Sequence, residues 1–223
     1  MSNESPKVDK AAVLLVNKPY RWTSFDVVKK LRYALKLKKI GHAGTLDPLA
    51  TGLLVLCTGK MTKQIEVFQG QEKEYTGTFV LGKTTPSYDL ETEVDAEKKI
   101  DHLSTQEIMA ATAPLTGWID QIPPIYSAIK VDGKRAYESA RKGEELALKS
   151  RKVEIKTFEI TNINLPEVDF RVVCSKGTYI RSLARDFGAI LGVGAYLSAL
   201  CRTRIGDFTL TEACTIEEII AES

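Results

Sequence analysis

A single carboxylate lies in a segment that is otherwise uncharged and rich in glycine. Within positions 41–59, Asp47 is the only residue with a formal charge, and Gly44 and Gly52 lie on either side of it. Pro48 disfavours helical backbone angles at Asp47, which narrows the directions in which the carboxylate can point. A carboxylate held in this way can serve as a nucleophile. It can equally cap a helix that has Pro48 at its first position.

A second group of polar side chains lies within Ser175–Arg181. Lys176, Tyr179 and Arg181 fall at the start of a helix predicted over 178–191. The N-terminal end of a helix carries partial positive charge, so a cation there is slightly unfavourable. A nearby anion would account for Arg181, and an ordinary surface arginine is the alternative.

Hydrophobic patterning predicts the elements that must position these residues. The segment 41–52 is predicted to be a loop, and the apolar run Leu53–Cys57 after it a buried strand. Thr23 and Asp26 have the spacing of a capping box, which predicts a helix over 24–37. Strands and helices interleave without a regular β-α-β order, which favours one α+β domain over residues 1–223. Further strands are predicted at 12–16, 74–81, 125–131, about 151–163 and 168–174. Further helices are predicted at 61–69, 104–113, 136–142 and after Thr215. A turn is predicted at Asp132–Gly133, a loop over 83–101 and disorder over 1–10.

Residues 77–84 match the phosphate-binding pattern G-x-x-x-x-G-K-[ST] letter for letter. That pattern needs a flexible loop between its glycines and a helix after it. Here the intervening residues are strand formers, and Pro86 disfavours a helix after Thr84. We therefore reject the match. The strand that replaces it places Tyr75 on the same face as Phe79, where a core role is the alternative to a functional one.

Composition excludes several classes of protein. Apolar residues make up 43% and charged residues 27%, which excludes a disordered chain, a collagen and a disulfide-rich miniprotein. The net charge of +2 conceals two basic segments, 23–39 and 130–152, and an acidic one, 89–101. Each is compatible with a solvated face, but two basic segments in a nearly neutral chain indicate a polyanionic partner.

The cysteines and histidines do not form a metal-binding pattern. The four cysteines have no C-x-x-C spacing, and the only histidines are His42 and His102. We therefore expect no metal and free thiols in a reducing compartment. The N-terminus has no apolar signal region, and no apolar run approaches the length of a membrane span. These features favour a cytoplasmic protein with no membrane contact.

Four motifs occur together and in a fixed order: Asn17-Lys18-Pro19, Gly41–Gly52, Gln121–Lys130 and Ser175–Arg181. Together they resemble the TruB family of tRNA pseudouridine synthases, which modify uridine 55 in the T arm. The resemblance covers roughly residues 12 to 206. It implies a mixed, mainly antiparallel sheet flanked by helices, with an active cleft across it. It favours the functional interpretation of Asp47 over the helix cap.

The resemblance also implies roles for individual residues. Asp47 matches the catalytic aspartate, and Arg181 the arginine that pairs with it and would keep it charged through a two-pronged contact. Tyr75 matches the tyrosine that stacks on the target base and is a candidate for the later proton transfer. His42 matches the histidine beside the flipped nucleotides. Other matched positions are Tyr179 and Leu200 in the uracil pocket, Lys18 and Lys130 in substrate-binding motifs, Asp89 as a loosely matched acidic position, and 121–153 as a mobile thumb over the RNA.

The implied reaction needs no cofactor, because it is an isomerisation without redox change or group transfer. The carboxylate can attack C1′ or C6 of the target uridine, and both routes stay open. The nucleotide must be flipped out of the folded RNA first. We expect a monomer that acts on the T arm of tRNA, with no further RNA-binding domain after Ser223. A noncatalytic RNA-binding protein and a synthase for another RNA are the alternatives.

Overall fold

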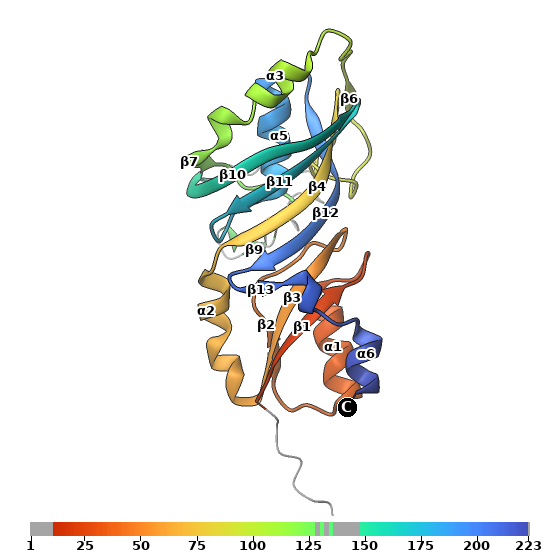
Figure 1. Ribbon diagram of the computed structural model, residues 1–223, viewed down its shortest axis with the longest axis vertical. Helices are drawn as coiled ribbons and strands as arrows, with labels where there is room; N and C mark the ends of the chain where they lie inside the picture. The colour runs from red at the N-terminus through yellow and green to blue at the C-terminus, as the bar shows by residue number, and fades with distance from the viewer. Residues whose placement is uncertain (1–10, 128–129, 132–133, 136–147, 223) are drawn as a thin grey trace, which may run out of the picture. The chain divides into compact units, whose positions relative to one another are not determined.

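The computed structural model describes residues 11–127, 130–131, 134–135 and 148–222 (Figure 1). The contacts divide the chain into two compact units. The first unit comprises Met1–Glu74 and Cys201–Ser223, and the second comprises Tyr75–Leu200. Two strands, β4 (Lys73–Leu81) and β12 (Ala195–Ile205), pass from one unit into the other. Among the described residues, no helix has both the length and the apolar character of a membrane span.

The first unit is built around the strand order β1–β3–β12, with β2 paired to β3 and β13 to β12. β1 (Val13–Lys18) runs antiparallel to β3 (Ala50–Thr58), and Val16 lies opposite Leu54. The remaining elements of this unit are β2 (Ile40–His42), β13 (Phe208–Thr209), the α-helices α1 (Ser24–Ala34), α2 (Ile65–Gly70) and α6 (Ile216–Ala221), and the 3₁₀ helices η1 (Gly59–Gln64) and η3 (Leu210–Glu212).

Strand β3 is covered on both faces. Leu54 and Leu56 pack in the core beneath α1 and α6. Leu53 and Val55 point the other way and pack with Phe68 of α2. In Figure 1, α1 and α6 accordingly lie together on one side of this unit and α2 on the other. Burial of both faces explains why this strand is a continuous apolar run rather than an alternating one.

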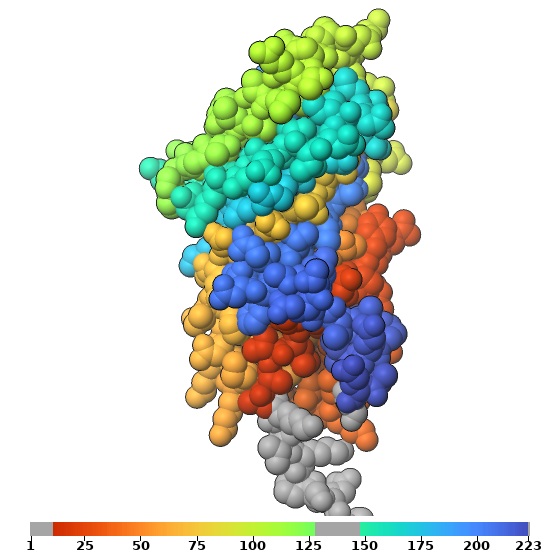
Figure 2. Space-filling model, viewed as in Figure 1, coloured from red at the N-terminus to blue at the C-terminus, as the bar shows by residue number. Residues whose placement is uncertain are grey.

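The second unit has the strand order β12–β4–β11–β10–β7. β10 (Arg151–Asn164) runs antiparallel to both β11 (Glu167–Cys174) and β7 (Gly117–Gln121). Figure 2 shows β10, in teal, forming a strip of surface beside the yellow-green segment that carries α3 and β7. The other elements are α3 (Thr105–Ala110), α5 (Ile180–Ile190), the 3₁₀ helix η2 (Ala113–Leu115), and the paired short strands β5 (Lys83–Thr84) with β6 (Ala96–Glu97) and β8 (Lys130–Val131) with β9 (Lys134–Arg135).

An aromatic cluster joins α5 to the sheet of the second unit. The ring centroid of Phe187 on α5 lies 5.6 Å from that of Phe79 on β4 and 5.5 Å from that of Phe158 on β10. Phe170 on β11 stacks on Phe79 at 4.1 Å. Aromatic pairs at such distances stabilise beyond the burial of their area. The cluster therefore fixes α5, which carries Arg181 in its first turn.

Most of the predicted elements are present, and the capping boxes at Thr23 and Thr215 are confirmed. The α+β class is also confirmed. The helix predicted over 24–37 ends at Ala34, because Lys36 takes the left-handed backbone conformation with φ 51°. The helix predicted over 61–69 is a 3₁₀ helix up to Gln64, where the Thr62 hydroxyl donates to the Gly59 carbonyl. Such a local side-chain bond competes with regular helix.

Several boundaries were wrong for identifiable reasons. The predicted loop 41–52 gives its two ends to β2 and β3, and the predicted loop 83–101 contains β5 and β6. Of the strand predicted over 125–131, the described residues 125–127 are not strand, because the Tyr126 carbonyl accepts a bond from Arg181 instead of from a neighbouring strand, whereas Lys130–Val131 form β8. The predicted helix 136–142, the turn at Asp132–Gly133 and residues 1–10 lie outside the described residues.

We predict that Gly52→Ala destabilises the protein by about 2–4 kcal/mol. Gly52 has φ +98°, and a Cβ there would lie 2.4 Å from the carbonyl oxygen and 2.7 Å from the amide nitrogen of Arg202. Gly70→Ala is the matched control, because an added Cβ meets nothing within 4 Å there. Urea unfolding of the two variants measures the difference. Equal stability of both variants would contradict this account of the close approach between β3 and β12.

Candidate active site

Asp47 lies in the first unit, on the loop between β2 and β3, and its side chain is partly exposed. Residues 48 and 49 form a turn that leads into β3, so the alternative that Asp47 caps a helix is wrong. Its carbonyl accepts a bond from the amide of Ala50 at 3.1 Å. Just before it, the amide of Leu46 donates to the buried hydroxyl of Ser24 on α1 at 2.9 Å. The backbone on both sides of Asp47 is therefore fixed.

Arg202 on β12 is the largest fully buried side chain of the described residues and binds this loop. Its guanidinium donates to the carbonyls of Gly44 at 3.3 Å, Thr45 at 3.4 Å and Leu53 at 2.8 Å. These acceptors lie before and after Asp47 in the chain. A buried cation is tolerated only when it has hydrogen-bond acceptors, and here the loop and strand β3 supply them.

Sequence analysis did not identify Arg202. An arginine on the inward face breaks the apolar alternation of Ala195–Ile205, so that stretch gave no strand pattern. A signal was nevertheless present. Arg202 lies two residues after Leu200, which the family resemblance had already singled out.

Lys18 is a second buried cation beside the same loop. Its ammonium donates to the carbonyls of Pro19 at 3.0 Å, Trp22 at 2.5 Å and Pro48 at 3.3 Å. The pKa of Lys18 is lowered to about 8, chiefly by burial and also by the positive charge of Arg202, while the negative charge of Asp47 acts in the opposite direction. Lys18 thus joins the segment after β1, through Pro19 and Trp22, to the loop of Asp47, through Pro48, and a direct substrate contact remains a prediction.

His42 is the last residue of β2 and is half-buried. Burial lowers the pKa of His42, the backbone of Gly44 acts in the opposite direction, and the nearby Arg202 cation adds to the lowering. The ring is therefore neutral at pH 7. Its Nδ1 is buried and has no hydrogen-bond partner among the described residues. A neutral, half-buried ring is compatible with the predicted place beside flipped nucleotides.

Arg181 is the centre of a polar network in the second unit. Its Nε lies 3.5 Å from Oδ2 of Asp89, and both side chains are buried, with exposed fractions of 4% and 7%. Its Nη1 donates to the carbonyl of Tyr126 at 2.9 Å and lies 3.5 Å from that of Ser87. The alternative that Arg181 is a surface arginine is therefore wrong. Asp89, which sequence analysis matched only loosely, is an ion-pair partner.

Tyr179 immediately precedes α5 and is held by Gln121 at the end of β7. The Gln121 amide donates to the Tyr179 carbonyl at 3.1 Å and accepts from its backbone amide at 2.8 Å. The guanidinium of Arg151 lies 4.9 Å from the Tyr179 ring centroid. Sequence analysis placed Gln121 in a motif but gave it no role. It positions Tyr179.

The remaining predicted site residues are Tyr75, Leu200 and Lys130. Tyr75 on β4 is 8% exposed, and Leu200 on β12 is half-buried. The backbone of Lys130 lies in β8, and its side chain lies outside the described residues. The first unit thus brings together Lys18, His42 and Asp47, and the second unit holds Tyr75, Tyr179, Arg181 and Leu200. The pairing of Arg181 with Asp47 remains a prediction.

We predict that the free energy of unfolding of the wild type minus that of Lys18→Met increases between pH 8 and pH 10.5. Lys18 binds its proton less tightly when folded, with a pKa of about 8 against 10.5. In this window the unfolded chain binds more protons, so stability rises with pH, by up to about 3 kcal/mol.

Urea unfolding at several pH values measures this difference. The exposed Lys60 supplies the control, because Lys60→Met should leave the pH dependence of the wild type unchanged. A difference between wild type and Lys18→Met that stays constant from pH 8 to pH 10.5 would refute the shifted pKa.

Comparison with known proteins gives a consistent assignment. The family model for the TruB family pseudouridylate synthase N-terminal domain matches residues 32–180, and that for the tRNA pseudouridylate synthase B C-terminal domain matches 181–223. A protein of Flavobacterium johnsoniae named tRNA pseudouridine synthase B is 58% identical over 92% of both chains. One of the same name from Parabacteroides distasonis is 55% identical over 93% of this chain and 91% of its own.

Solved structures agree with this assignment. A chain in the crystal structure of a Cbf5–Nop10–Gar1 complex is 30% identical, with a TM-score of 0.74. The match covers 94% of this chain and 53% of that one, so the protein spans about half the length of that solved chain. With the geometry above and close relatives over nearly their whole length, the chain belongs to the TruB family of pseudouridylate synthases.

Proposed function

We propose that this protein isomerises uridine 55 in the T arm of tRNA to pseudouridine, with Asp47 as the nucleophile. The observation that carries the proposal is the setting of Asp47. It is a partly exposed carboxylate on a loop whose backbone Arg202 and Lys18 hold by hydrogen bonds. The names of the relatives at 58% and 55% identity support tRNA as the substrate.

The reaction breaks the C1′–N1 bond, turns the uracil and joins C1′ to C5. The proton on C5 is lost and N1 gains one, so the product is an isomer and no oxidant or group donor takes part. Asp47 can start the reaction by attack on C1′ or on C6. Its bond to the substrate breaks in a later step, so the carboxylate is regenerated. A fixed backbone at this loop reduces the motion that must be frozen when the carboxylate reaches its target.

Other residues supply binding and orientation under this proposal. The base stacks on Tyr75, and such stacking is worth about 1–3 kcal/mol per base, which offsets the cost of flipping the nucleotide. Tyr75 is also a candidate for the later proton transfer. The neutral ring of His42 fills the space that the nucleotide leaves. Tyr179 and Leu200 line the uracil pocket.

Arg181 orients Asp47 in this scheme. Its contacts with Asp89 and with the carbonyl of Tyr126 hold the guanidinium in place. A planar guanidinium held in this way has one fixed orientation, which a two-pronged contact with a carboxylate requires. Segment 121–153, which includes Lys130, closes over the RNA. The enzyme acts as a cytoplasmic monomer.

The test is tritium release from a tRNA transcript labelled with [5-³H]uridine, with purified protein and no added cofactor or metal. Release from this transcript, and none from one with cytidine at position 55, is the expected result. Release from both transcripts would mean that another uridine is the target. Binding without release from either would favour a noncatalytic RNA-binding protein.

We predict that Asp47→Asn lowers turnover by about 10⁴-fold or more, since it removes the charge of the nucleophile but little volume. The variant should still bind tRNA with the affinity of the wild type. Asp207→Asn is the matched control, because Asp207 is exposed on the turn between β12 and β13. Activity of Asp47→Asn close to that of the control would exclude the nucleophile assignment.

We predict that Arg181→Lys loses at least about 100-fold in kcat with a smaller change in KM. A lysine retains the charge but cannot contact Asp89, the Tyr126 carbonyl and a third group at once through a planar fork. Single-turnover kinetics separates the chemical step from binding, and a thermal melt checks the fold. Unchanged kcat in a folded variant would remove Arg181 from the mechanism.

A further inference from the structure

A surface pocket of about 410 Å³ lies on the first unit, against the exposed face of α1. Its helical lining residues recur from Asp26 to Tyr33 at positions i, i+3, i+4 and i+7, so they share one face of the helix. Val27, Val28 and Leu31 bury the opposite face in the core. The pocket is lined by Arg21, Trp22, Asp26, Lys29, Lys30 and Tyr33.

The charge of this pocket favours an anion. Arg21, Lys29 and Lys30 supply three cations against the single carboxylate of Asp26. That carboxylate is already committed to the helix cap, because it accepts bonds from the Thr23 hydroxyl at 2.6 Å and the Thr23 amide at 2.9 Å. Asp26 keeps its negative charge, which also acts on Lys29, but three cations against one carboxylate still leave the pocket with a net charge of +2, so it complements a phosphate backbone.

The pocket also presents aromatic rings. Tyr33 is 73% exposed, although a tyrosine in a soluble protein usually buries much of its ring. Trp22 packs partly against the core beneath α1, which holds its ring in place. Exposed rings beside cations are the combination that binds unpaired nucleotides, since bases stack on the rings while cations contact phosphates.

Backbone bonds join this pocket to the loop of the candidate nucleophile. The amide of Arg21 donates to the carbonyl of Pro48 at 2.8 Å. The ammonium of Lys18 donates to the carbonyls of both Trp22 and Pro48. Pro48 directly follows Asp47 in the chain. An RNA strand whose uridine reaches Asp47 therefore has its neighbouring nucleotides within reach of the pocket.

We propose that this pocket binds a nucleotide of the substrate RNA close to the target uridine. Its base stacks on the exposed ring of Tyr33 beside Trp22, and its phosphate contacts Arg21, Lys29 and Lys30. Because every base has a stacking face, the pocket reads the presence of an unpaired nucleotide rather than its identity. This inference rests on the proposed function, since it takes the substrate to be an RNA.

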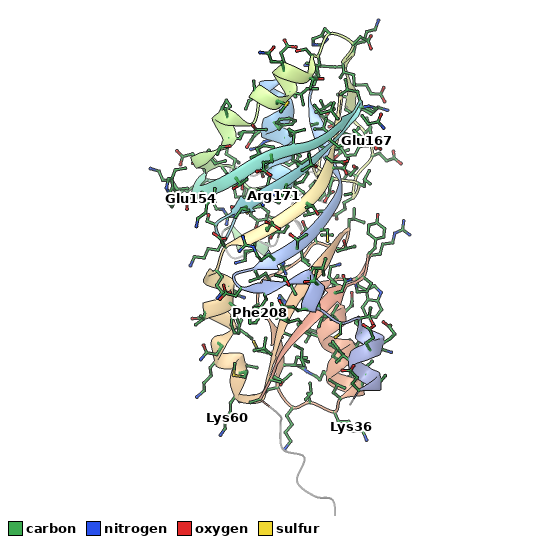
Figure 3. All side chains as sticks on the ribbon, in the orientation of Figure 1. Lys36, Lys60, Glu154, Glu167, Arg171 and Phe208 are labelled. Atoms are coloured by element: carbon green, nitrogen blue, oxygen red, sulfur yellow. The ribbon has the colours of Figure 1, made fainter. Side chains whose placement is uncertain are left out.

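The first test compares two pairs of substitutions with equal loss of charge. Lys29→Ala/Lys30→Ala removes two lysines from the pocket, and Lys60→Ala/Lys63→Ala removes two exposed lysines from η1. Figure 3 shows Lys60 near α2 and Lys36, just after α1, on opposite sides of the first unit, so the control lies away from the pocket. The ligand is a T-arm hairpin, and the readouts are Kd at several salt concentrations, KM and kcat.

The pocket pair should raise Kd and KM by about 10-fold and leave kcat within about 2-fold. It should also reduce the slope of log Kd against log salt by about 1.5, as expected for two lost phosphate contacts. The control pair should match the wild type. Tyr33→Ala should raise Kd about 10-fold, whereas Tyr33→Phe, which keeps the ring, should not.

A second measurement reports on the pocket directly. The chain has two tryptophans, so Trp118→Phe leaves Trp22 as the only one. Titration with the hairpin should quench the fluorescence of Trp22, and Tyr33→Ala in the same background should shift the quenching to about 10-fold higher RNA concentration.

The failures of the two proposals are distinguishable. A wild type that forms no pseudouridine in any RNA would overturn the proposed function, and this inference with it. An active wild type whose pocket variants keep its Kd, KM and Trp22 quenching would overturn the inference alone. The same holds if the pocket variants change the sedimentation of the protein but not its RNA affinity, because the surface would then be a contact between copies of this chain.

Discussion

The hydrogen bonds from the buried guanidinium of Arg202 to the carbonyls of Gly44, Thr45 and Leu53 determine the local arrangement of the first unit. A guanidinium has five N–H donors and no acceptor, so a buried one needs acceptors inside the protein. The loop that carries Asp47 and strand β3 supply them. Gly52 allows the backbone of β3 to approach the backbone of Arg202 closely, because a Cβ at this position would collide with it.

The same logic applies in the second unit, where Arg181 is buried beside Asp89 and the carbonyl of Tyr126. Each unit therefore buries an arginine, where an apolar side chain is usual, next to residues of the candidate site. Replacing such groups with apolar ones often leaves stability unchanged or higher. Their value in this fold thus lies in fixing the geometry of loops, which a non-directional apolar contact would not do.

Sequence patterns predicted those parts of the fold in which local preference and burial agree. The capping boxes at Thr23 and Thr215 and the long hairpin of β10 and β11 are examples. Patterns failed where tertiary contacts replace local ones. β12 was missed because Arg202 occupies an inward position, and the segment after Pro124 was assigned as strand although a side chain, Arg181, binds its backbone.

The site divides in a similar way. Asp47 and Arg181 were found because their residue types and the motifs around them are unusual, and the resemblance gave them roles. Arg202 and Gln121 were not, because they act on the backbone of other residues and leave no chemical signature of their own. The pocket on α1 needed the structure as well, since the predicted helix puts Lys29, Lys30 and Tyr33 on one face but does not show that Arg21 and Trp22 line the same pocket.

Strand β3 has hydrogen-bonded neighbours along both edges and packed side chains on both faces. Backbone amides in such a strand exchange with solvent only when the whole domain opens, whereas those of surface loops exchange through small local fluctuations. The loop of Asp47 is continuous with this strand at one end, and Leu46, at its middle, is bonded to Ser24 of α1. The loop is therefore held at two points, and the doubly covered strand β3 begins only three residues beyond the carboxylate.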